Sequence, residues 1–120
     1  MSERNPTIYN LEERTALFGE QVIAFAQQVP KGIITNPLVS QLVRSGTSVG
    51  ANYCEADDAE SKKDFKHKLG ICKKEARETT HWLRMISKAC PAEASRARVL
   101  WQEAKELNHI FNAITNKLNE

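Results

Sequence analysis

The sequence lacks a long hydrophobic run, and it contains only three cysteines. None of its apolar stretches approaches the roughly 20 residues that a membrane-spanning helix needs. The segment from Met1 to Tyr9 is polar and has no apolar stretch typical of a signal peptide. The number of cysteines is odd, and no C-x-x-C spacing occurs among Cys54, Cys72 and Cys90. Both observations argue against a disulfide framework and a zinc site. We therefore expect a cytoplasmic protein without a membrane segment, whose thiols are reduced.

Glycine and proline are also scarce, with 5 and 4 residues in a chain of 120. Together with a hydrophobic fraction of 41%, this composition is typical of a folded globular chain rather than a disordered or fibrous one. The length suits one domain, here expected to span residues 1–120. The formal net charge of +2 is too small to predict a nucleic-acid or membrane partner, so any such partner must be argued from where the charges lie.

Apolar residues recur every three or four positions in four segments, which is the spacing of one helix face. The helices predicted from this pattern cover about residues 10–29, 36–56, 61–89 and 93–118. No segment shows the alternating pattern of a strand. Because four amphipathic helices with short connections bury their apolar stripes in one core, the sequence predicts an all-α fold, an up-down-up-down four-helix bundle.

Local signals predict where the helices begin and end. Proline interrupts the chain after the first and third helices, where it cannot continue a helix. We expect Thr35 or Asn36 to cap the second helix. The third helix is expected to begin with Ser61 as its cap, because Asp64 follows three positions later.

The second predicted helix carries two apolar rows instead of one. The first row contains Leu38, Leu42 and Val49. The second row is a candidate oligomer interface and consists of Val39, Val43, Gly46 and Gly50. Each glycine costs roughly 1 kcal/mol relative to alanine inside a helix, so the pair indicates that another backbone approaches closely. That backbone belongs either to the same bundle or to a second copy of the chain. If it belongs to a second copy, the protein self-associates, and this is what we predict.

The sequence resembles a known family over residues 41–87. The resemblance is carried by the run from Gln41 to Tyr53, Glu55-Ala56, Ser61 to Phe65, Lys68 to Ile71, Glu75-Ala76, Glu78-Thr79 and Trp82-Leu83. It is similar to the four-helix bundle proteins related to the 23S rRNA intervening-sequence protein. Weaker likeness extends over nearly the whole chain. The sequence departs from the commonest pattern at Cys54 and at Arg84-Met85, so no role is carried over to those positions.

This resemblance implies a cytoplasmic bacterial bundle that forms homopentamers. Some members of the family are encoded within insertions of 23S rRNA genes. Distant relatives are accessory proteins of diversity-generating retroelements, which bind nucleic acid and reverse transcriptase. For most members no molecular function is settled, so the resemblance implies the fold more strongly than the activity.

Two Glu-x-x-His motifs provide the one pattern typical of an enzyme. Glu78 and His81 form the first motif, and Glu106 and His109 form the second. Di-iron bundles use two such motifs, but their ligands point into the core and include a glutamate from each of the other helices. Helical spacing places both motifs outside the apolar rows. We therefore expect no metal, no cofactor and no enzymatic activity.

Charge placement gives the clearest binding signal. Residues 62–77 contain seven basic and two acidic side chains, a local charge of +5. The candidate nucleic-acid-binding residues in this segment are Lys62, Lys63, Lys66, Lys73, Lys74 and Arg77. Their helical spacing places much of this charge on one exposed face, which suits sequence-independent binding to phosphates of RNA or DNA. Alternatively, the lysines are solvated, or they neutralise the acidic turn at residues 55–60.

Two function classes therefore remain open. The first is an oligomeric nucleic-acid-binding accessory protein. The second is an oligomeric scaffold that binds another protein. We expect Phe65 and Trp82, the aromatic residues near the lysines, to pack within the bundle, which weakens the case for base stacking on single strands.

Overall fold

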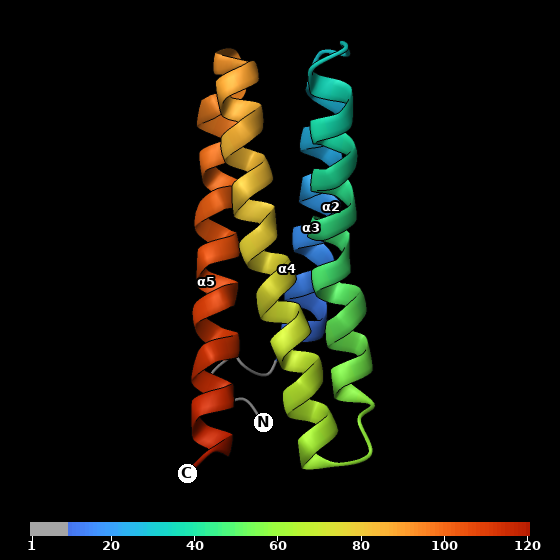
Figure 1. The fold of residues 1–120 in the computed structure, drawn as a ribbon, viewed down its shortest axis with the longest axis vertical. Coiled ribbons are helices and arrows are strands. Elements are labelled where there is room, and N and C mark those ends of the chain that lie inside the picture. Colours follow the sequence, from blue (N-terminus) through green and yellow to red (C-terminus); the bar gives the residue numbers. More distant parts are fainter. Residues whose placement is uncertain (1–9) are drawn as a thin grey trace.

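The computed structural model describes residues 10–120 and folds them into four long α-helices. These are α2 (Leu11–Gln28), α3 (Thr35–Asp57), α4 (Lys62–Ala89) and α5 (Ala94–Leu118), with a short 3₁₀ helix, η1 (Pro91–Glu93), before α5. Each helix runs antiparallel to the one before it, as Figure 1 shows. The described residues contain no strand. The predicted all-α four-helix bundle is confirmed, and the helix bounds lie within one residue of those predicted.

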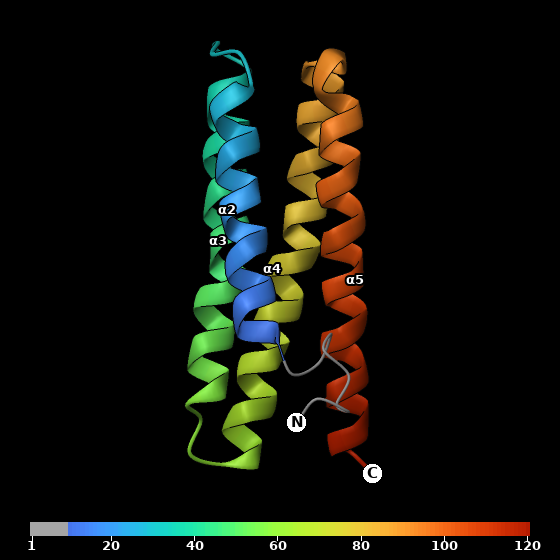
Figure 2. The ribbon, with the colours of Figure 1, turned by 180° about the vertical axis from the view of Figure 1, so that it is seen from behind.

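The helices follow one another around the bundle in chain order. Figures 1 and 2 show α2 beside α3 and α4 beside α5, in a rod that measures 46 × 27 × 20 Å. The contact between α2 and α5 is much smaller than the contacts between consecutive helices. The bundle therefore has four long sides, which we call the α2–α3, α3–α4, α4–α5 and α2–α5 sides. None of its helices combines the length and apolar character that crossing a bilayer requires.

The core is built from the four predicted apolar stripes. The longest stripe belongs to α4 and buries Leu69, Cys72, Ala76, Thr79, Leu83 and Ile86. Phe18 and Val22 of α2, Leu42 and Val49 of α3, and Leu107 and Phe111 of α5 are buried against it. Removing such side chains from water is the main favourable term in folding. The interior contains one polar link between helices, in which the hydroxyls of Ser45 and Thr79 share a hydrogen bond of 2.9 Å between α3 and α4.

One predicted helix cap is confirmed and the other is wrong. The Ser61 side chain accepts a hydrogen bond of 3.0 Å from the backbone N–H of Asp64 at the start of α4. Thr35 and Asn36, by contrast, already lie within α3. Their side chains hold the preceding turn instead: the Thr35 hydroxyl donates to the Pro30 carbonyl at 2.7 Å, and Asn36 accepts from the Gly32 N–H at 3.1 Å.

The close approach at Gly46 and Gly50 lies within the chain. A Cβ at Gly46 would stand 2.8 Å and 2.9 Å from the two Cγ atoms of Val22 in α2, and one at Gly50 would stand 3.3 Å from the backbone of Thr15. Val39 packs against the core and Val43 is half-buried. The two glycines of the second apolar row therefore pack on α2 of the same chain, which accounts for the close approach within the bundle. Contact of Val39, Val43, Gly46 and Gly50 with another copy stays a prediction.

The glycine contact predicts opposite effects of the same substitution at two positions. Gly46→Ala is expected to destabilise the protein, because overpacking against Val22 costs about 1–3 kcal/mol while helix propensity returns only about 1 kcal/mol. Gly70→Ala is the matched control: nothing lies within 4 Å of the added Cβ, so it is expected to stabilise by about 0.5–1 kcal/mol. Urea unfolding of both variants checks this. Equal stabilisation by both would contradict the packing described.

The thiols are expected to differ sharply in reactivity. Burial raises the pKa of Cys72 to about 12, while Cys54 is exposed on α3. Because the thiolate is the reactive form, Cys72 is expected to resist alkylation in the folded protein and to react only on unfolding. Mass spectrometry of alkylated peptides, with and without denaturant, measures this. Labelling of Cys72 in the native state as fast as that of Cys54 would contradict the core placement.

Candidate nucleic-acid interface

A groove runs between α4 and α5 on the outside of the bundle. Its wider part has a volume of about 790 Å³. The lining comes from both helices and includes Gly70, Lys73, Lys74, Arg77, Glu78, Thr80, His81 and Arg84 of α4, with Trp101, Asn108 and Asn112 of α5. A narrower part of about 390 Å³ continues toward the η1 end, where Leu83, Ser87, Ala94, Ala97 and Arg98 join Arg84 and Trp101. We call the two parts together the α4–α5 groove.

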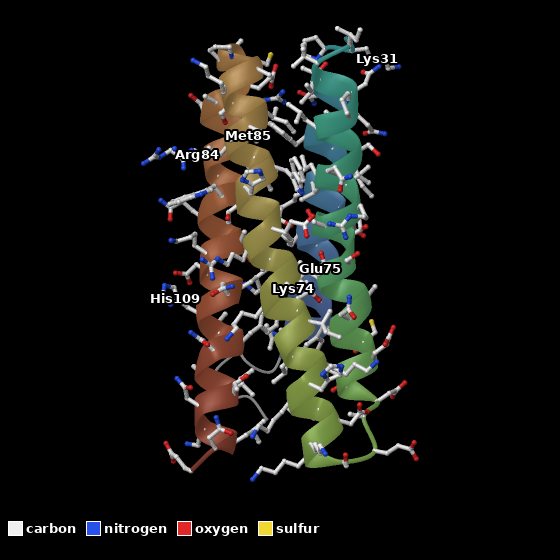
Figure 3. The ribbon with its side chains drawn as sticks, in the orientation of Figure 1. Lys31, Lys74, Glu75, Arg84, Met85 and His109 are labelled. Carbon is white, nitrogen blue, oxygen red and sulfur yellow. The ribbon has the colours of Figure 1, made fainter. Side chains whose placement is uncertain are left out.

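The basic residues reach this groove because of where they fall relative to the buried stripe of α4. Lys66, Lys73, Arg77 and Arg84 are spaced by seven, four and seven residues, which keeps them on one flank of a helix. That flank faces α5: Lys73 Nζ donates to Asn112 Oδ1 at 3.0 Å, and Lys66 donates to the Asn119 side chain. In Figure 3, Arg84 lies toward α5, whereas Glu75 lies toward α3.

The sequence-predicted residues thus fall into three groups. Lys73, Lys74 and Arg77 line the groove directly. Lys66 lies further along the same flank and binds α5. Lys62 and Lys63 are exposed in the first turn of α4, beyond the groove lining. The structure therefore brings part of the predicted basic set together and leaves the first two lysines at the end of the helix.

Four glutamates of α4 and α5 are paired with arginines of α2 and α3. On the α3–α4 side, Arg44 pairs with Glu78 and, at 3.3 Å, with Glu75. Across the α2–α5 side, Arg14 pairs with Glu103 at 2.7 Å, and its Nη2 lies 3.8 Å from Glu106. Among these carboxylates only that of Glu78 also borders the α4–α5 groove, whose other charged lining residues are basic or histidine.

Glu78 is the one carboxylate among the lining residues of the α4–α5 groove. It accepts a hydrogen bond of 2.9 Å from Trp82 Nε1 and also binds Arg44. These two contacts lower the pKa of Glu78 below its ordinary value. Its charge is therefore compensated from the α3 side and offsets little of the groove's positive potential.

One lysine of α4 neutralises a carboxylate of the acidic turn at residues 55–60, as the alternative interpretation predicts. Lys68, which points toward α3, binds Glu55 at 2.7 Å, and this contact raises the pKa of Lys68. Among residues 10–120, the six candidate nucleic-acid-binding residues form no ion pair with a carboxylate. Most of the basic charge is thus available to an outside anion.

Sequence reasoning missed the contribution of α5. Trp101 lines both parts of the groove, and two cations lie over its ring: Lys105 Nζ at 5.0 Å and the Arg98 guanidinium at 6.0 Å from the centroid. The sequence does contain a signal for these residues. Helical spacing places Trp101, Asn108 and Asn112 on one flank of α5, each next to a residue of the buried stripe. The sequence argument on base stacking considered Phe65 and Trp82 but not Trp101, which lies beside the basic residues in the folded chain.

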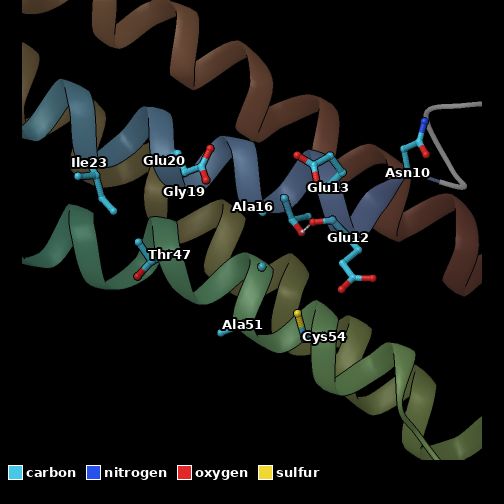
Figure 4. A pocket seen from close by; sticks show the side chains of 12 residues that line it. Asn10, Glu12, Glu13, Ala16, Gly19, Glu20, Ile23, Thr47, Ala51 and Cys54 are labelled. Carbon is cyan, nitrogen blue, oxygen red and sulfur yellow. Dashed lines mark hydrogen bonds between the residues drawn. The ribbon is translucent and has the colours of Figure 1, made fainter.

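The other open sides have different chemistry. The α2–α3 side is hollowed over about 590 Å³ and is lined by small residues with Glu12, Glu13 and Glu20 at its edge, as Figure 4 shows. The depression on the α2–α5 side is mostly apolar, and its lining of Gln21, Ala24, Phe25, Gln28, Val99 and Leu100 includes one cation, Arg96. The Arg14–Glu103 ion pair lies on the same side of the bundle. Only the α4–α5 side has the positive character that phosphate binding requires.

The two Glu-x-x-His motifs point outward, as expected. His81, Glu106 and His109 are exposed, and Glu78 is held by Arg44 and Trp82. Residues 10–120 contain no group of three or more His, Cys, Asp or Glu side chains placed to hold a metal ion.

Comparison with known proteins agrees with this architecture. A crystal structure described as a protein with unknown function from the S23 ribosomal protein family of Bacteroides thetaiotaomicron VPI-5482 is similar, with a TM-score of 0.79 and 26% identity. The match covers 92% of this chain and 98% of that one. The search of curated proteins finds no match. The family model of the 23S rRNA-intervening sequence protein matches residues 10–113. The chain therefore belongs to the 23S rRNA-intervening sequence protein family.

Proposed function

We propose that the protein binds nucleic acid through the α4–α5 groove and acts as a non-enzymatic accessory protein. The observation that carries the proposal is the division of charge across α4. Its acidic flank is compensated by Arg44, while its other flank presents Lys73, Lys74, Arg77 and Arg84 without a carboxylate partner among the described residues.

A groove of this kind suits a phosphate backbone. Lysine and arginine bind phosphates with little dependence on sequence, and binding is driven in part by the release of counterions. From Lys66 to Arg84 the basic flank extends over 18 residues, which corresponds to about 27 Å of helix. Several successive phosphates fit along that length.

The family name supports an association with RNA. The family is described by its link to 23S rRNA, and the similar crystal structure is assigned to a ribosomal protein family. Neither description states what this chain binds. A cytoplasmic protein associated with RNA agrees with both descriptions and with the basic groove.

We further propose that the protein self-associates through the α2–α5 side. Leu17 is 47% exposed and Val99 is 70% exposed. Val99 lines the mostly apolar depression around Ala24, in which Arg96 is the one charged side chain, and Leu17 falls on the same face of α2 as Gln21 and Ala24. Exposed apolar surface of this kind favours contact with another protein surface. Assembly there leaves the α4–α5 groove open and places several grooves on one particle. The family resemblance implies a pentamer.

Binding is expected to weaken steeply with salt and to depend on the groove cations. With about five phosphate contacts, the logarithm of the association constant for a single strand should fall with the logarithm of salt at a slope of roughly −3.5. The double substitution Lys73→Glu and Arg77→Glu is expected to weaken binding by at least about tenfold at low salt. Fluorescence anisotropy with a labelled RNA of about 20 nucleotides measures both effects.

The matched control changes the same net charge elsewhere. Lys31 lies in the connection between α2 and α3 (Figure 3). Lys117 is exposed near the end of α5, and neither residue lines the groove. Substitution of both by Glu is expected to leave binding nearly unchanged. No binding at low salt, or equal loss in both double variants, would contradict the proposed site and favour the protein-scaffold alternative.

The oligomer is expected to depend on the apolar α2–α5 side. Light scattering should give a mass several times that of the 13.5 kDa chain, and five times if the resemblance holds. The double substitution Leu17→Glu and Val99→Glu is expected to reduce that mass, because it places charges on the contact surface. Ile33→Glu, at a side chain 91% exposed in the α2–α3 connection, is the control. A monomeric wild-type protein at micromolar concentration would overturn the proposal.

A further inference from the structure

The two tryptophans of the chain have different environments. Trp82 is anchored: its Nε1 donates to Glu78, and its ring packs edge-on against His81 with centroids 4.8 Å apart. Among residues 10–120, the indole N–H of Trp101 makes no comparable hydrogen bond, and its ring borders both parts of the α4–α5 groove. Trp101 is therefore the aromatic side chain that a ligand in the groove meets.

Cations surround the Trp101 ring. Arg98 and Lys105 lie over it from α5, and Arg84 of α4 lines the same narrower part of the groove. This part measures about 390 Å³, within the range of sites that accept small planar ligands, and is otherwise lined by small or apolar side chains. An aromatic face with guanidinium and ammonium groups around it suits a flat ring that is attached to a phosphate.

Amide groups extend the site along α5. Asn108 donates to the Lys73 carbonyl at 3.0 Å, which leaves its carbonyl oxygen for another donor. Asn112 accepts from Lys73 through Oδ1, which leaves its two N–H groups. Base edges form hydrogen bonds with groups of this type. Phosphate-binding, stacking and amide groups therefore follow one another along one groove.

We infer that Trp101 stacks on an unpaired base, so that the α4–α5 groove binds single-stranded nucleic acid in preference to a duplex. This inference rests on the proposed function. Stacking on an aromatic side chain is available to every base and needs no particular sequence. In a duplex both faces of each base are already stacked, and bringing one onto Trp101 requires flipping it out of the helix at a cost of a few kcal/mol.

The test uses Trp82→Phe, in which Trp101 is the only tryptophan and its fluorescence reports the groove alone. The probes are a uridine homopolymer of about 20 nucleotides and an RNA duplex of the same length, at low salt. We expect the single strand to quench Trp101 fluorescence and to bind at least about tenfold more tightly than the duplex. Trp101→Ala is expected to lose about 5- to 150-fold in single-strand affinity, measured by anisotropy, while keeping its salt dependence.

A second variant separates stacking from folding. Trp101→Phe retains an aromatic face and is expected to keep most of the single-strand preference, whereas Trp101→Ala loses it although thermal unfolding shows that it is folded. Equal binding of single strand and duplex without quenching overturns the stacking inference and leaves the proposed function standing. Absence of binding to either probe overturns both.

Discussion

The burial of the α4 stripe is the constraint on which the rest of the structure depends. With Leu69, Cys72 and Leu83 in the core, helical periodicity leaves no freedom in where the remaining residues of α4 point. Glu75 and Glu78 pair with Arg44 of α3, whereas Lys73, Lys74, Arg77 and Arg84 line the groove beside α5. A packing requirement therefore sets the electrostatic character of two sides of the bundle.

The sequence was sufficient for the helices and their buried faces, because apolar spacing alone determines both. It also located the basic part of α4, whose members lie close together in the chain. The place of Trp101 in the groove was not predicted, because it depends on which flank of α4 packs beside α5. No local sequence pattern encodes that contact. For the same reason the glycine pair of α3 predicted a close approach correctly but not its partner, Val22, which lies on another helix.

The sides of the bundle differ in chemistry, so the two contacts that we propose, with nucleic acid and with other copies, fall on different sides. Binding at the α4–α5 groove breaks none of the ion pairs described, so the groove need not give up internal stabilisation to accept an anion. The apolar α2–α5 side shares α5 with that groove. Subunits joined through it would hold their grooves in a fixed relation, so that one long strand can engage several of them at once.

The small contact between α2 and α5 has a consequence for motion. Arg14 bound to Glu103, and Arg96 lying 5.7 Å from the centre of the Phe25 ring, are polar or cation–π contacts that span a seam with few buried apolar neighbours. Regions of this kind have the lowest free energy of local opening. Of the contacts between neighbouring helices, the one between α2 and α5 is therefore where we expect solvent to enter the interior first.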